Sequence, residues 1–482
     1  MDSVKAPLYL KLAGHFERSI VGGTLRPGDR LPSIRTLHDQ FRVSVSTIVQ
    51  ALMWLEDRGH VEPRDRSGFY VRVRDADLAP EPMMTRAPLT PRWAGVNAVV
   101  GEVVKAAADP DRVPLGAGAP PPSMFPTARM NRLLSRVARE NPAHSAKYFF
   151  PPGSLDLRRQ IARRGTDIGM TVSPDDVVVT SGAMEALNLA IRAVAKPGEV
   201  VAVESPTYFG VLQVLESLGM RVLEVPAHPQ SGIDLARLEQ GIRAHKVKAC
   251  IVMTNCHNPL GFVLADQAKR DLVELARRRN IAIIEDDIYG DMAFSEQRPR
   301  PAKAFDRDGR VLLCSSFSKV LAPGFRVGWI QAGRYQPVVE QLQFINTVAA
   351  PSLPQLVVAR MLESGSYQRH IRRLRDGLAT QVQAMSRAIS RYFPPGTRVT
   401  RPAGGYLLWV QLPGGMDAEH VRTRALAAGI SVVPGHVCST AGKFRQHLRI
   451  SCASPYTDAI DRAVETLGRI VAGLQEKRRA RA

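Results

Sequence analysis

A lysine that follows directly on an apolar run is a candidate for covalent chemistry in this sequence. The run at 311–314 is followed by Ser316, Ser318, Lys319 and Arg326. A lysine amine can form a Schiff base with a carbonyl compound, while nearby hydroxyl and guanidinium groups can bind an anion. A solvated surface lysine could have the same neighbours, so the pattern needs support from the rest of the chain.

Four earlier apolar runs of strand length also end in polar or small residues. These runs begin at positions 177, 200, 249 and 281, and helical patterns separate them. Near-continuous runs rich in Val and Ile that alternate with helices predict a buried, mostly parallel sheet in an α/β domain. Ligands of such sheets bind at the carboxyl ends of the strands. The residues just after each run are therefore the candidate site residues.

These positions carry groups of several chemical kinds. Residues 181–183 follow the first run and open a helix, so their backbone N–H groups suit a phosphate. Asn258 offers a side-chain amide after the third run, and Asp286 and Tyr289 come at the end of the fourth. Taken singly, each is as typical of a turn or a helix cap as of a ligand site.

One cofactor requires all of these groups together. Pyridoxal 5'-phosphate needs an amine for a Schiff base, an acid beside its pyridine nitrogen, donors near its phenolic oxygen, and a cationic, N–H-rich cup for its phosphate. The sequence therefore predicts that the large domain binds pyridoxal phosphate. In order and approximate spacing, the set resembles the fold-type I aminotransferases across residues 112–470.

That resemblance implies a role for each matched residue. Lys319 would form the Schiff base, Asp286 would hold the protonated pyridine nitrogen, and Tyr208 would stack on the ring. Asn258 and Tyr289 would hydrogen-bond the ring oxygen. The residues implied to bind the phosphate are Ser181, Gly182, Ala183, Ser316, Ser318 and Arg326.

The same resemblance implies an effector site and a homodimer. Arg449 would bind a substrate or effector carboxylate through its planar guanidinium, and Gly118 would line the same pocket. Tyr148 matches a tyrosine that, in this family, reaches the phosphate in the neighbouring subunit. The effector is expected to be a small amino compound, which the sequence does not identify further.

The first 75 residues predict a different kind of module. Apolar residues recur every four positions from Leu8 to Ile20, which predicts a helix. Ser33 and Ser44 suit the N-caps of two further helices, and residues 60–73 predict two short strands around a polar turn. Three helices and such a hairpin predict an α+β winged helix-turn-helix, which places the start of its third helix in the major groove of DNA.

This segment resembles the winged helix-turn-helix domain of the GntR family. The matching motifs are PLY at 7–9, G-x-L-x-P-G-x-x-LPS-x-R-x-L at 23–37, V-S-x-x-T-I at 43–48, LE-x-x-G at 55–59 and S-G-F-x-V at 67–71. The resemblance covers almost the whole segment and implies that it binds double-stranded DNA.

The start of the third helix is the implied DNA-reading surface. Val45 stands where many family members have arginine, which favours a thymine-methyl contact there or a larger share of readout for Arg35 and Gln50. Arg35 and Arg66 are the candidates for phosphate contacts. The residues expected to face the major groove are Ser44, Val45, Ser46, Thr47 and Gln50.

The predicted organisation is a DNA-binding domain at 1–75, a linker at 76–110 and an aminotransferase-like domain of fold type I at 111–482. Most of the linker is proline-rich and lacks periodicity, although residues 96–107 could form a helix that belongs to either side. At 482 residues, of which 45% are hydrophobic and 23% charged, the chain is long enough for about two to three globular domains.

The net charge of +20 does not locate the DNA site. The first 75 residues hold 12 Lys and Arg against 9 Asp and Glu, a balance of only +3. The basic surface elsewhere favours nonspecific attraction to polyanions, or is simply solvated.

The start lacks a signal-peptide pattern and no uncharged apolar run approaches about 18 residues, so we expect a cytoplasmic protein without a membrane segment. Five scattered cysteines without a C-x-x-C pair argue against a disulfide framework or a zinc site.

The joined architecture resembles the MocR branch of GntR-type bacterial transcription regulators, in which an aminotransferase-like domain senses an effector. Three interpretations stay open. In the first, an amino compound or the cofactor itself acts through Lys319 to regulate DNA binding. In the second, the chain is an active amino-acid aminotransferase that carries a DNA-binding module. In the third, the large domain only dimerises and binds no cofactor, which the complete set of site residues argues against.

Overall fold

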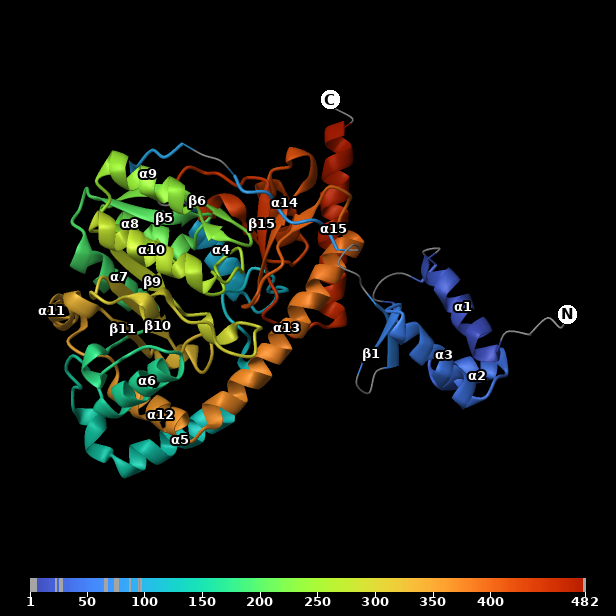
Figure 1. The fold of residues 1–482 in the computed structure, drawn as a ribbon, viewed down its shortest axis with the longest axis horizontal. Helices are drawn as coiled ribbons and strands as arrows, with labels where there is room; N and C mark the ends of the chain where they lie inside the picture. The colour runs from blue at the N-terminus through green and yellow to red at the C-terminus, as the bar shows by residue number, and fades with distance from the viewer. Residues whose placement is uncertain are drawn as a thin grey trace. The chain divides into compact units, whose positions relative to one another are not determined.

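The structure, a computed structural model, forms two compact units (Figure 1). The smaller unit runs to Ala79, and the larger unit holds most of the chain from Pro80 onward. The residues that the structure describes are 7–21, 24–25, 29–64, 68–72, 78–85, 88–93, 95 and 98–479.

The smaller unit consists of three helices and an antiparallel hairpin. Ser33 accepts a hydrogen bond from the N–H of Thr36 at 3.1 Å, and Ser44 accepts one from the N–H of Thr47 at 3.2 Å, so both predicted N-caps are present. The predicted winged helix-turn-helix is confirmed. Its elements are α1 (Leu8–Val21), α2 (Ile34–Phe41), α3 (Val45–Asp57), β1 (Val61–Arg64) and β2 (Gly68–Val71).

One apolar core joins the helices and the hairpin of the smaller unit. From α1, Leu12 and Phe16 are buried in it, whereas Leu8 is 63% exposed. Ile48 and Leu55 of α3 are fully buried against them. The four-residue spacing therefore marked the right face of α1, although its first member lies outside the core.

The larger unit is built on a nine-stranded sheet in the spatial order β3-β6-β5-β8-β9-β10-β11-β4, with β7 paired to β6. The five central strands β6, β5, β8, β9 and β10 run parallel, which confirms the predicted parallel sheet. The strands β3, β7 and β11 are antiparallel to their neighbours. The strands are β3 (Arg92–Trp93), β4 (Val178–Thr180), β5 (Val200–Ser205), β6 (Arg221–His228), β7 (Gly232–Ile233), β8 (Ala249–Val252), β9 (Ala282–Asp286), β10 (Val311–Ser316) and β11 (Gly328–Gln331).

Helices cover both faces of this sheet. Along β5, Val201 and Val203 pack with α7 and α8, whereas Val200 and Ala202 pack with α9 and α10. Successive side chains of a strand point to opposite faces, so a strand that is buried on both sides must be apolar throughout. The four helices, labelled in Figure 1, are α7 (Ala183–Val194), α8 (Phe209–Ser217), α9 (Leu235–His245) and α10 (Asp266–Arg279).

A second, antiparallel sheet in the order β12-β13-β15-β14 forms the C-terminal part of the larger unit. Its strands are β12 (Arg398–Val399), β13 (Leu407–Gln411), β14 (Val433–Pro434) and β15 (His447–Ser451). The remaining α-helices are α4 (Ala98–Ala108), α5 (Thr127–Glu140), α6 (Leu155–Asp167), α11 (Gln336–Thr347), α12 (Ser352–Glu363), α13 (Ser366–Tyr392), α14 (Ala418–Ala427) and α15 (Asp458–Arg479).

Much of the segment expected as a linker at 76–110 is packed on the larger unit instead. The short strand β3 pairs with β6, and Val100 and Val103 of α4 join a core cluster that contains Trp409. The apolar face of α4 is stabilised by burial, so this helix is part of the domain and not of a spacer. The helix left open at 96–107 thus belongs to the aminotransferase-like side.

Several further features bear on the expected chemistry. All five cysteines are buried and free, and burial raises the pKa of each thiol. Within the described ranges, no three His, Cys, Asp or Glu side chains are grouped so that they could hold a metal ion. None of the helices described is both long and apolar enough to cross a membrane.

We predict that Leu55→Ala will destabilise the smaller unit by about 2–5 kcal/mol, because it leaves a cavity in a fully packed core. Hydrogen exchange of the α3 peptide in the full chain measures this loss. Met53, which lies on the same helix and is 54% exposed, gives the matched control. Equal exchange in Leu55→Ala and Met53→Ala would contradict the assigned core.

Candidate functional site

A cavity of about 370 Å³ lies where β9 and β10 end. Asp286 is the last residue of β9, Ser316 is the last of β10, and Lys319 follows three positions later, as expected for a ligand site at the carboxyl ends of parallel strands. The predicted site residues that line this cavity are Gly118, Ala183, Tyr208, Asn258, Asp286, Tyr289, Ser316, Ser318, Lys319, Arg326 and Arg449.

The Lys319 amine is well placed to act as a nucleophile. Its Nζ donates a hydrogen bond to the carbonyl oxygen of Gly118 at 2.6 Å. Burial lowers the pKa of Lys319 to about 8; the charges of Arg449 and Arg326 act in the same direction, and Asp286 opposes them. A larger fraction of this amine is therefore neutral near neutral pH than for a surface lysine, and the neutral amine is the reactive form.

The Asp286 carboxyl group is almost completely removed from water, with 1% exposure. Burial raises its pKa to about 7, and the neighbouring charge of Asp287 adds to this shift. A hydrogen bond from the N–H of Ile288 at 3.3 Å and the charge of Lys319 favour ionisation. A protonated ring nitrogen beside this carboxylate would favour its charged form further.

Three tyrosine hydroxyl groups surround the inner part of the site. Tyr289 Oη lies 3.2 Å from Tyr406 Oη, which donates to the carbonyl oxygen of Gly118 at 2.8 Å. Burial raises the pKa of Tyr208, of Tyr289 and of Tyr406, so these hydroxyls keep their protons as donors. No motif in the sequence marked Tyr406, which is adjacent to the site only because β13 begins beside it.

An anion-binding corner is formed at the start of α7. Arg326 donates to Ser318 Oγ at 3.3 Å and to the carbonyl oxygen of Ser181 at 2.9 Å. Gly182 has a φ of +97°, and a Cβ at this position would lie 2.4 Å from Arg326 Nη2, so only glycine lets the guanidinium approach. The positive end of the α7 dipole, which begins at Ala183, and this guanidinium both favour a negatively charged group.

Three predicted cofactor residues do not line the cavity. The N–H of Ser181 donates to Glu185 Oε2 at 2.5 Å, so that donor is already used, and Gly182 lies behind Arg326. Tyr148 is 69% exposed and packs its ring 5.5 Å from that of Phe150. The Glu185 contact had no signal in the sequence beyond an acidic residue in the first turn of a helix.

Two buried polar atoms of predicted site residues, Asn258 Oδ1 and Arg449 Nε, have no hydrogen-bond partner among the described residues. Arg449 is 2% exposed, and its one hydrogen bond within the described part of the chain runs from Nη2 to the carbonyl oxygen of Gly116 at 3.2 Å. Leaving a buried polar group unpaired costs about 1–3 kcal/mol, so both atoms suit a polar ligand. The donor set as a whole fits pyridoxal phosphate and a carboxylate.

Helix α4 contributes an apolar wall that the sequence prediction missed. The residues involved are Val103, Val104, Ala107 and Ala108. They fell in the segment assigned to the linker, although the apolar run AVVGEVVKAAA could have indicated a packed helix. The site is therefore partly closed by a helix that precedes the parallel strands of the main sheet in the chain.

The predicted DNA-reading residues lie at the exposed start of α3. Four of them, Ser44, Val45, Ser46 and Gln50, are exposed, and Thr47 is half-buried. Arg35 of α2 is also exposed, and Arg66 lies outside the described residues.

Two family models match the chain, one for each unit. Residues 8–71 match the bacterial regulatory proteins of the gntR family, and residues 111–467 match aminotransferase class I and II. The chain belongs to the MocR-type regulators, which join a GntR-family DNA-binding domain to an aminotransferase class I and II domain. Pyridoxal phosphate is the cofactor of that second domain.

Individual relatives agree with this assignment. The chain is 39% identical to the HTH-type transcriptional regulator YdcR and 40% identical to the HTH-type transcriptional regulator YjiR, both of Escherichia coli; each match covers 96% of this chain and 98% of the relative. Among solved structures, the α-aminoadipate aminotransferase LysN of Thermus thermophilus, complexed with N-(5'-phosphopyridoxyl)-L-leucine, matches with a TM-score of 0.73 and 29% identity over 79% of this chain and 96% of LysN.

We predict that Arg449→Gln will raise the pKa of Lys319 above about 8, because the variant removes a cation that disfavours the protonated amine. At pH 8 the neutral fraction of Lys319 should fall, so an amine-specific reagent should modify Lys319 of cofactor-free protein more slowly. Mass spectrometry of the Lys319 peptide across a pH series measures this. Arg445→Gln, which removes an exposed arginine paired with Asp417, is the control. Identical profiles for Arg449→Gln and wild type would refute the assigned coupling.

Proposed function

We propose that this protein is a transcription regulator whose aminotransferase-like domain holds pyridoxal phosphate on Lys319 and senses an amino compound or the cofactor itself. The observation that carries the proposal is that Lys319, Asp286 and Arg449 line one cavity in a chain that also has a winged helix-turn-helix. These three side chains supply the amine, the ring partner and the carboxylate clamp that such a sensor needs.

Each part of the cofactor has a partner in the site. When bound, pyridoxal phosphate supplies an aldehyde that combines reversibly with amines and a ring that withdraws electrons. Asp286 would accept the N–H of the ring, Asn258 and Tyr289 would bind the ring oxygen, and Tyr208 would lie against the ring face. Ala183, Ser316, Ser318 and Arg326 would bind the phosphate, with Ser181 and Gly182 holding the arginine in place.

The effector is expected to combine an amine with a carboxylate. Arg449 has a buried guanidinium whose Nε has no partner among the residues that the structure describes, which suits bidentate binding of a carboxylate. The effector amine would compete with Lys319, and the displaced lysine, with a pKa of about 8, could accept or donate a proton at neutral pH. Regulation follows if the effector binds unequally to two conformations of the protein.

DNA recognition and a homodimer belong to the same proposal. The exposed start of α3 would enter the major groove, and two copies would read two half-sites.

A group of apolar side chains is exposed on the larger unit: Tyr148, Phe150, Phe344 and Ile345. The rings of Phe150 and Phe344 lie 6.1 Å apart. A gathered apolar surface of this kind is typical of a subunit interface, and Tyr148 would there reach the partner's phosphate. A DNA-binding role in a bacterium would also accord with the expected cytoplasmic location.

A second candidate function is amino-acid transamination at the same site. The observation in its favour is that Lys319 supplies the amine for a Schiff base and, with its lowered pKa, is also able to move protons beside Arg449. Formation of an oxo acid at a rate of order 1 per second would establish it. Exchange of amines on the cofactor without oxo acid would leave regulation as the function.

We predict that Lys319→Ala will abolish the response of DNA affinity to cofactor and amines. In the wild type, an effector should change the affinity about 5–150-fold, the usual range for coupled sites. The measurement is binding to the DNA upstream of the protein's own gene at fixed salt, with amino compounds and pyridoxal phosphate added. Lys196→Ala, which removes an exposed lysine, is the control. An undiminished response in Lys319→Ala would refute sensing through this amine.

Substitutions in the DNA-binding unit should separate readout from phosphate contact. Gln50→Ala should cost about 1–3 kcal/mol on the preferred site and little on random DNA, because a base contact is lost. Arg35→Ala should weaken binding to both and lower the slope of log affinity against log salt by about 1. Titrations at several salt concentrations measure both quantities. Equal losses of Gln50→Ala on both DNAs would exclude base readout by this residue.

A further inference from the structure

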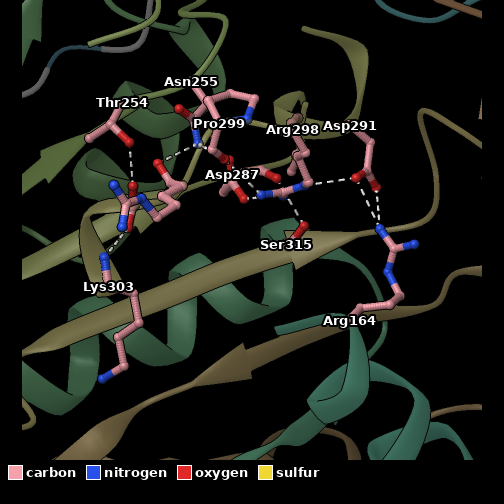
Figure 2. Close-up of polar contacts among 12 residues, drawn as sticks. Arg164, Thr254, Asn255, Asp287, Asp291, Arg298, Pro299, Lys303 and Ser315 are labelled. Atoms are coloured by element: carbon pink, nitrogen blue, oxygen red, sulfur yellow. Dashed lines mark hydrogen bonds and ion pairs between the residues drawn. The ribbon is translucent and has the colours of Figure 1, made fainter. Parts of the chain in front are cut away.

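Behind the cofactor cavity, a chain of four charged side chains links the end of β9 to α6. Arg298 contacts the Asp287 carboxylate and donates from Nε to Asp291 Oδ1 at 2.7 Å. Arg164 of α6 donates from Nη2 to Asp291 Oδ2 at 2.8 Å. Figure 2 shows this row of two guanidinium groups and two carboxylates. Asp287 is the residue next to Asp286, so the row begins directly behind the acid proposed to hold the cofactor ring.

The ion pair between Arg298 and Asp287 is buried and closely packed. The Asp287 side chain is 1% exposed and that of Arg298 is 17% exposed, so water screens their contact little. A Cβ on Gly290 would lie 2.5 Å from Asp287 Oδ1 and 2.7 Å from Arg298 Nη2, so the pair packs against a glycine. The Asp287 backbone is fixed as well, because its N–H donates to the carbonyl oxygen of Cys314 at 2.9 Å.

The other groups around Asp287 do not replace Arg298. Asn255 Nδ2 donates to Asp287 Oδ1 at 3.0 Å, and Lys269 Nζ donates to Asn255 Oδ1 at 2.8 Å. Lys269 is thus linked to Asp287 by hydrogen bonds through a neutral amide, and its charge acts on Asp287 from beyond that amide. Among the residues that the structure describes, Arg298 is the cation that contacts Asp287 directly.

Asp286 itself is surrounded by titratable groups from several elements. Those that act on it are Tyr208, Glu285, Asp287, Tyr289, Cys314 and Lys319. Burial raises the pKa of Glu285, which accepts hydrogen bonds from the N–H groups of Ala302 and Lys303. Asp287 is the acidic neighbour whose charge is balanced by a guanidinium in contact with it.

We propose that Arg298 is a positioning residue for the cofactor site: its guanidinium neutralises Asp287 and anchors the end of β9, so that Asp286 is presented as a carboxylate to the cofactor ring. Asp291 weakens this effect, because it also pairs with Arg298. Arg164 limits that weakening, because it compensates the charge of Asp291. The inference rests on the proposed pairing of Asp286 with the ring nitrogen.

Opposite changes in the row should have opposite effects. Arg298→Gln leaves Asp287 uncompensated, which disfavours ionisation of Asp286. In Asp291→Asn, Asp287 is the remaining carboxylate paired with Arg298, and the positive charge of Arg164 is no longer compensated. Both changes favour ionisation of Asp286. A purely structural role would instead weaken the site in the same direction for both variants.

The test is the dissociation constant of pyridoxal phosphate from the full-length protein, measured by equilibrium dialysis across a pH series. Affinity should fall as pH decreases and Asp286 takes up a proton, and the ionisation of free cofactor cancels between variants. Relative to wild type, this fall should begin about one pH unit higher in Arg298→Gln and at lower pH in Asp291→Asn. Arg298→Lys keeps the charge and should resemble wild type.

Arg300→Gln is the matched control, because Arg300 lies two residues away and its guanidinium pairs with Asp266 instead. Shifts of Arg298→Gln and Asp291→Asn in the same direction, or a shift of Arg300→Gln equal to that of Arg298→Gln, would overturn the proposed role. If Arg298→Gln does not fold, a shift to lower pH in Asp291→Asn together with no shift in Arg298→Lys supports the role, and any other combination overturns it. A wild-type affinity that does not vary with pH would instead remove the pairing of Asp286 with the ring, and the inference with it.

Discussion

The buried carboxyl group of Asp286 is the constraint on which the larger unit depends. An acid with 1% exposure is stable as a carboxylate only when cations or donors face it, since burial alone favours the neutral form. In the structure, the N–H of Ile288 and the charge of Lys319 favour the carboxylate, whereas the charge of Asp287, which Arg298 contacts, opposes it. Parallel strands make the arrangement possible, because their carboxyl ends bring these side chains to one edge of the sheet.

Binding and regulation draw on the same arrangement. The charge of Arg449 disfavours the protonated form of Lys319 in the cavity, and an anionic ligand would relieve that repulsion. An effector that brings its own carboxylate and amine therefore changes the charge balance of the site in a way that cofactor alone does not. Such a difference in charge is the kind of unequal interaction that can shift a protein between two conformations and so alter DNA binding.

Much of the fold and many of the site residues could be predicted from local sequence. Apolar runs marked strands buried on both faces, serines marked the N-caps of α2 and α3, and residues after the runs proved to line the cavity. Contacts between distant segments could not be predicted. Tyr406 bonds to Gly118, 288 positions earlier, and Arg298 reaches Asp287 through a loop without regular periodicity. Glu185 accepts a hydrogen bond from the N–H of Ser181, a contact that no sequence motif indicates.

The most direct test of the account is the affinity of the purified full-length protein for the DNA just upstream of its own gene, at fixed salt. It should be measured with and without pyridoxal phosphate and against random competitor DNA, because so basic a chain binds any DNA at low ionic strength. We predict binding that is specific for this DNA and that changes when the cofactor is added. Binding no tighter than to random DNA, and indifferent to cofactor, would contradict it.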